Sequence, residues 1–153
     1  MAMIALGCVV ATPVAARPKT VMIVVDDIPG TENCGVSTGR VEELMVELME
    51  EEGVSLRDRN PDFIASADVN LVAIPDETGA WSKTCGFRID IELQLHHEMR
   101  LEGVGKFKVI SKLCEGGFTG FMSDGNLLFF MQSFRQSFDH CFERLPPMVA
   151  RAL

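Results

Sequence analysis

The sequence predicts an α+β (mixed α/β) fold, with one mostly antiparallel sheet of four to five strands and two helices packed on one face. Short apolar runs rich in β-branched residues predict strands, and a longer segment with strict two-residue alternation predicts a strand with one wet face. Two further segments carry apolar residues at helical spacing. With 153 residues, of which 47% are hydrophobic, the chain is long enough to bury one core.

The first half of the chain contains a strand, a helix and a second strand. Thr20–Val25 is a β-branched run that predicts a central strand. A helix capped at Ser37 or Thr38 follows, and it carries one apolar stripe. The stripe consists of Val41, Leu44, Met45, Leu48 and Met49. We interpret the polar stretch Arg57–Ser66 as a connection and Val69–Ile74 as the second strand.

The second half contains a hairpin and a final helix. From Cys85 to His96 apolar and polar residues alternate strictly, which predicts one core face and one wet face. After a turn at 102–105, the residues from Phe107 onward continue the apolar face as an antiparallel partner strand. The glycines at 116 and 117 indicate a bulge in that strand. A helical pattern runs from Asn126 to Leu145 and ends at two prolines.

The amino terminus is similar to a secretory signal peptide. Met3–Val14 is an almost uncharged apolar run, and it is followed by the small residues Ala15 and Ala16, which suit a signal-peptidase cleavage site. A polar segment begins at Arg17. We therefore predict a cleaved leader over residues 1–16, one globular domain over 17–153, and a periplasmic or secreted location. No basic residue precedes the apolar run, so a buried first strand or helix is the alternative.

Loss of the leader would also make the number of cysteines even. Cleavage removes Cys8 and leaves four cysteines, which can form two disulfides in an oxidising compartment. These four are Cys34, Cys85, Cys114 and Cys141. The alternative is that the cysteines are free and behave as small buried apolar groups.

Among the three possible pairings, we favour Cys34 with Cys85 and Cys114 with Cys141. If the first two strands run parallel, Cys34 and Cys85 both lie beyond the same edge of the sheet and can pair. Measured from the turn near Ser123, Cys114 lies about 30 Å back along its strand and Cys141 lies about 27 Å along the helix. Because these distances match, the two cysteines can meet. Strict alternation, however, places Cys114 on the lysine-bearing face, so this pairing requires an irregularity near residues 109–110.

The net charge of −8 argues against nucleic acid as a partner, because phosphates would be repelled. Acidic residues follow several expected strands, and their oxygens suit Ca²⁺ or Mg²⁺. The candidate ligands are Asp26, Asp27, Asp76 and Asp124. No Asp-x-Asp-x-Asp-Gly calcium loop is present, and acidic residues also favour turns for backbone reasons, so no cofactor is the default expectation.

Two histidines adjoin a glutamate in the alternating strand. Adjacent strand residues point to opposite faces, so we interpret His96 and His97 as solvent-exposed histidines at a strand end and not as ligands of one metal ion. The sequence contains neither a Gly-x-Ser-x-Gly nucleophile elbow nor a Cys-x-x-Cys motif. These observations favour binding over catalysis.

Aromatic residues supply the candidate interface. Trp81 lies in a polar loop, and Phe130 and Phe134 belong to a phenylalanine stripe on the final helix, which core packing alone also explains. The sequence thus predicts an exported, disulfide-containing binding or accessory protein that is not an enzyme, with an unknown protein or small-molecule partner. The alternatives are a divalent-metal-dependent hydrolase that uses the acidic cluster, and an assembly subunit that uses the final helix.

Overall fold

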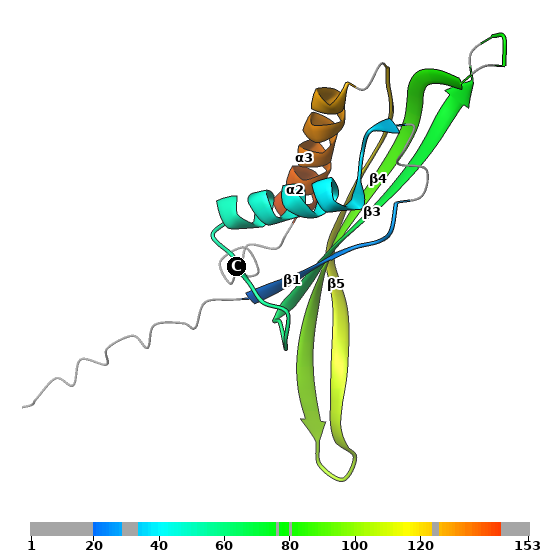
Figure 1. Ribbon diagram of the computed structural model, residues 1–153. Coiled ribbons are helices and arrows are strands. Elements are labelled where there is room, and N and C mark those ends of the chain that lie inside the picture. The colour runs from blue at the N-terminus through cyan, green and yellow to red at the C-terminus, as the bar shows by residue number, and fades with distance from the viewer. Residues whose placement is uncertain (1–19, 29–33, 76, 80, 124–125, 145–153) are drawn as a thin grey trace, which may run out of the picture.

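The protein forms one five-stranded mixed sheet with two helices on one side (Figure 1). The computed structural model describes residues 20–28, 34–75, 77–79, 81–123 and 126–144, without the side chains of 81–83. The predicted leader over 1–16 lies outside these residues. The elements are β1 (Thr20–Val25), α2 (Thr38–Glu51), β2 (Ser55–Leu56), β3 (Phe63–Pro75), β4 (Trp81–Leu101), β5 (Gly105–Met122) and α3 (Leu127–Glu143).

The strand order β2-β1-β3-β4-β5 confirms the predicted fold class. β1 runs parallel to β2 and β3, whereas β3, β4 and β5 form an antiparallel meander. α2 begins at Ser37, whose side-chain oxygen accepts a hydrogen bond of 3.2 Å from the backbone N–H of Arg40. All five residues of its predicted apolar stripe are buried, so α2 packs its stripe into the core.

β3 begins six residues earlier than the sequence predicts. Phe63 and Ala65 are buried and pair with both β1 and β4, so part of the stretch that we interpreted as a connection is strand. The alternation was hidden because small alanines occupy the core positions and polar residues such as Ser66 occupy the other face. The two-residue strand β2 was also not predicted.

The sequence suggested a bulge in β5 at Gly116 and Gly117, but the irregularity lies elsewhere in this strand. Leu93 pairs with Cys114, whereas Gln94 pairs with residue 112, so Leu113 is the extra residue of a bulge. The bulge turns Cys114 from the lysine-bearing face to the helix face. Gly116 is instead a close-approach position, since a Cβ atom there would collide with the backbone of α3.

The phenylalanine stripe of α3 forms the centre of the core. Phe130, Phe134 and Phe138 are each at most 1% exposed, and the ring of Phe130 lies 5.4 Å from that of Phe87 on β4. The prediction that Phe130 and Phe134 lie at an interface is therefore not upheld, because the sheet of the same chain covers both rings. The assembly hypothesis that relied on this helix face loses its surface.

Candidate binding surface

Two disulfides attach the helical layer to the sheet. Cys34, just before α2, is bonded to Cys85 on β4, and Cys114 on β5 is bonded to Cys141 on α3. Their Cα–Cα distances are 5.9 and 5.0 Å. These are the pairs favoured from the sequence. The irregularity that the second pair requires was expected near residues 109–110, but it lies at Leu113, directly before Cys114. Two disulfides fit an exported protein, because such bonds persist in oxidising compartments.

Neither of the two described helices covers the opposite face of the sheet, and carboxylates collect on the middle part of that face. On β3, residues 63, 65, 67 and 69 are buried beneath the helices, whereas the alternate residues face away from them. The register of β4 and β5 brings acidic residues into neighbouring rows on this face. We call the acidic band the set Asp26, Asp68, Asp90, Glu92 and Glu115.

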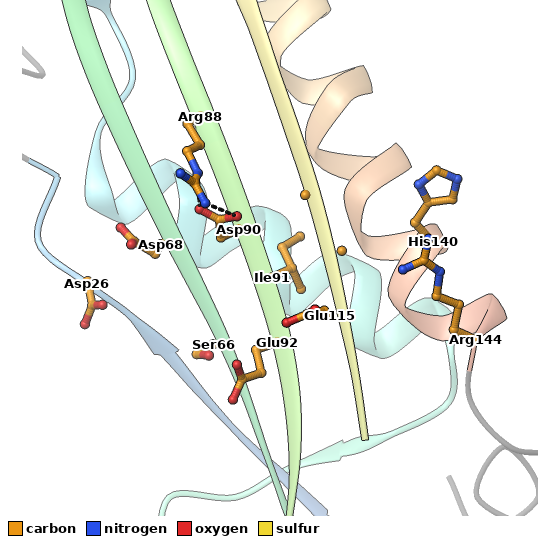
Figure 2. Close-up of a pocket in the computed structure, with 12 residues that line it drawn as sticks. Asp26, Ser66, Asp68, Arg88, Asp90, Ile91, Glu92, Glu115, His140 and Arg144 are labelled. Carbon is orange, nitrogen blue, oxygen red and sulfur yellow. Dashed lines mark hydrogen bonds and ion pairs between the residues drawn. The ribbon is translucent and has the colours of Figure 1, made fainter. Parts of the chain in front are cut away.

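Within this band, Asp68 and Asp90 are direct partners across β3 and β4. Arg88 lies two residues before Asp90 on the same face, and its Nε donates a hydrogen bond of 2.7 Å to the Asp90 carboxylate (Figure 2). Asn70 donates a hydrogen bond of 3.3 Å to Asp68. Like charges placed directly opposite each other destabilise a sheet. Here Arg88 forms an ion pair with Asp90, and its charge also attracts Asp68, which offsets part of the repulsion.

Glu92 and Glu115 form a second facing pair, across β4 and β5. The Nζ of Lys112 lies 2.8 Å from Glu92 and 2.9 Å from Glu115, so one cation serves both carboxylates. Burial raises the pKa of Glu92, but hydrogen bonds from Lys112 and Gln94, together with the Lys112 charge, outweigh burial and lower it. The hydrogen bonds to Glu92 and Glu115 in turn raise the pKa of Lys112.

The acidic band lines a shallow depression of about 580 Å³ (Figure 2). The depression extends across β5 at Gly116 and Gly117 to the end of α3, where His140 and Arg144 complete its wall. Its lining contains five carboxylates and two guanidinium groups, and Lys112 is paired with two of these carboxylates, so the net charge is about −2 with His140 counted as neutral. This arrangement attracts cations and repels anions.

The four predicted metal ligands are only partly described. Asp26 and Asp27 follow β1 and are exposed, and the Asp26 N–H donates a hydrogen bond of 3.3 Å to the Ala67 carbonyl oxygen. Asp76 and Asp124 lie outside the described residues. Within the described part of the chain, no group of three His, Cys, Asp or Glu side chains is arranged to hold a metal ion.

The other predicted residues lie at separate places. His96 faces Ile110 and His97 faces Val109, so the two imidazoles start from opposite faces of β4, as expected. The Nε2 atom of His96 lies 3.2 Å from the side-chain oxygen Oε1 of Gln94. Trp81 is the first residue of β4 and not part of a loop, and its side chain is not among those described. None of these residues belongs to the lining of the depression.

The sequence contained part of the signal for the acidic band. Strict alternation from Cys85 to His96 already predicted that Asp90 and Glu92 would be wet. It did not reveal that each faces another carboxylate, because Asp68 was placed before the predicted strand and Glu115 lies beyond the unpredicted bulge. Pairing register is a tertiary property that one strand's pattern does not encode.

Comparison with known proteins finds no matching family model and no matching curated protein. Rare lipoprotein B from Shewanella oneidensis is similar at 10% identity and a TM-score of 0.34, over 82% of this chain and 92% of that one. A hypothetical protein from Chlamydia trachomatis is similar at 8% identity and a TM-score of 0.43, over 88% of this chain and 96% of that one. Neither likeness assigns a function to this chain.

Among the described residues, no helix is long and apolar enough to cross a membrane.

Proposed function

We propose that this protein is an exported, disulfide-stabilised binding protein that acts without catalysis, and that its acidic band binds a cationic partner. The observation that carries the proposal is the placement of two carboxylate pairs face to face on the uncovered side of the sheet. Lys112 and Arg88 offset part of the repulsion within these pairs, but the carboxylates outnumber the cations. Local conflicts of this kind concentrate at functional sites. A bound cationic group relieves the repulsion and gains charge-assisted hydrogen bonds.

The partner is expected to be a basic segment and not a single ion. The carboxylates are spread over the end of β1 and three strands, and the hollow of about 580 Å³ is open to solvent on the sheet face. Lysine or arginine side chains from one extended segment can reach several of these carboxylates together. Their charges also favour rapid association, which weakens as ionic strength rises.

A lysine-rich peptide labelled with a fluorophore tests this proposal by anisotropy. We expect it to bind the oxidised protein, to be released by salt, and to bind about tenfold more weakly after Asp68→Asn with Asp90→Asn. A glutamate-rich peptide of the same length is expected not to bind.

The matched control removes two carboxylates from the opposite side of the molecule. Glu42→Gln with Glu50→Gln changes net charge by the same amount on the exposed side of α2. We expect it to change affinity less than about twofold. Equal weakening by both double variants would show only a net-charge effect and would overturn the assignment of the band, as would absence of binding at low salt.

Export is tested by the intact mass of the protein from its native host. We expect a chain that begins at Arg17 and is lighter by four hydrogens than its reduced form, since two disulfides remove four thiol hydrogens. A full-length chain with every thiol free would contradict this part of the proposal.

A further inference from the structure

The acidic band continues, on the same face of the sheet, into a group of apolar side chains. Val72 on β3 pairs with Gly86 on β4, and Gly86 pairs with Phe121 on β5, so the three residues form one row across the sheet. Gly86 lies two residues before Arg88, which contacts the band, and therefore shares the face of the band. With Ile74, also on β3, the side chains of Val72 and Phe121 form what we call the apolar patch.

The apolar patch is open to solvent. Phe121 is 67% exposed and Val72 is 64% exposed, whereas Met122, the next residue on β5, is 2% exposed on the helix face. A Cβ atom at Gly86 would lie 3.5 Å from the Phe121 ring and 3.8 Å from Cδ1 of Ile74, so both side chains converge above the glycine. The patch is therefore one apolar surface that extends over three strands.

The apolar patch and the acidic band lie close enough for one bound segment to reach both. Asp90 follows Gly86 by four residues on the same strand, which corresponds to about 13 Å at the rise of a β-strand. About five residues of an extended segment span this separation. Arg88 lies between them, and its charge is engaged by Asp90 at 2.7 Å (Figure 2).

The other end of the acidic band is bounded by basic side chains. Over residues 94–100 and 106–112, the face of the band carries four basic side chains and one carboxylate. These are Arg100, Lys106, Lys108 and Lys112, with Glu98. A cationic segment is repelled from that end of the hairpin, so from the band it extends towards the apolar patch.

We infer that the basic partner of the acidic band carries apolar side chains next to its basic run, and that these side chains pack on the apolar patch. The band supplies the charge that brings the segment to this face, so this assignment rests on the proposed function. Phe121 is the main anchor, because aromatic side chains bury a large area and dominate the energetics of interfaces. The partner is thus an extended amphipathic segment, with lysine or arginine on the band and leucine or phenylalanine about five residues away.

Two labelled peptides test this inference by anisotropy on the oxidised protein. Both carry the same run of lysines, and they differ at one end, where one has two phenylalanines and the other has two serines. The pair is made with these residues at the amino end and again at the carboxyl end, because an extended segment can run in either direction. In one direction we expect the phenylalanine peptide to bind about tenfold more tightly, since burial of apolar surface adds to the charge attraction.

Salt separates the two contributions. We expect added salt to weaken both peptides, because it screens the attraction between lysines and carboxylates. The ratio of their affinities is expected to stay nearly constant, since burial of apolar surface is not screened.

Single substitutions locate the apolar contact. Phe121→Ser is expected to remove the tenfold difference and to leave the serine peptide unaffected, and Val72→Ser is expected to reduce the difference about threefold. The matched control is Ile110→Ser on the same strand and the same face, where the side chain is 58% exposed among the lysines. We expect this control to keep the full difference. Circular dichroism and the melting midpoint report whether each variant folds.

Three results would overturn the inference. They are equal affinity of the two peptides for wild type in both directions, a tenfold difference that persists in the folded Phe121→Ser variant, and a loss with Ile110→Ser equal to that with Phe121→Ser. Each of these leaves the acidic band intact if the serine peptide still binds and still responds to Asp68→Asn with Asp90→Asn. Absence of binding by every peptide at low salt would instead overturn the band, and the apolar contact with it.

Discussion

Replacing both cysteines of the Cys34–Cys85 disulfide by alanine is expected to lower the free energy of unfolding by about 4 kcal/mol. The bond links residues 51 apart in sequence and closes the longer of the two disulfide loops. Without it the unfolded chain regains the conformational freedom of that loop. In the folded state α2 also loses its covalent attachment to β4, and the loss is a large fraction of the roughly 5–15 kcal/mol typical of a domain.

Urea denaturation of the oxidised variants measures this effect. The matched control is the Cys114→Ala, Cys141→Ala variant, whose bond spans 27 residues, and the same relation gives a loss of about 3.5 kcal/mol. Reduction of the wild type is expected to lower stability by more than either variant. A loss below about 1 kcal/mol in both variants would mean that the bonds do not restrict the unfolded chain as argued.

Gly116→Ala is expected to destabilise the protein by about 3 kcal/mol, although it adds only one methyl group. The new Cβ would collide with the carbonyl oxygen of Ser137 and lie 3.2 Å from the backbone nitrogen of Cys141. Both are backbone atoms of α3, so a rotamer change cannot relieve the contact. The helix would have to move away from β5, where the disulfide at Cys114 holds it close.

The neighbouring glycine provides the control for this substitution. A Cβ at Gly117 faces the other side of the sheet and meets the carboxylate of Asp90 at 3.2 Å, a side chain that can shift. Gly117→Ala is therefore expected to change the free energy of unfolding by less than about 1 kcal/mol, within the range of surface substitutions. Equal losses for the two variants in urea denaturation would contradict the role of Gly116 as a contact with α3.

Local patterns accounted for most of the secondary structure. The β-branched run at β1, the stripe of α2 and the alternation of β4 each depend on neighbouring residues and a fixed repeat, so they can be read from one segment. β3 was found only in part because alanines at 65 and 67 carry little apolar signal, although both are buried. Burial at these positions comes from packing against the helices and not from side-chain size.

The acidic band shows where sequence patterns stop being informative. Asp68 and Asp90 are 22 positions apart, and Glu92 and Glu115 are 23 apart, so only strand register makes them partners. The bulge at Leu113 decides which residues of β5 face which side, and no turn residue marks it. The choice of Phe130 and Phe134 as an interface failed for a related reason, since an apolar helix face does not specify which surface covers it.

By itself, the sequence determined the fold class, the two helices, the wet face of β4 and a set of cysteines able to pair. These properties depend on side-chain periodicity and composition, which are local. Only the tertiary structure decided the facing carboxylates, the contact of Gly116 with α3 and the exposure of the cross-strand pair Met99 and Phe107. Each arises where segments distant in sequence meet or fail to meet, and register, twist and layer coverage are settled only when the whole chain packs.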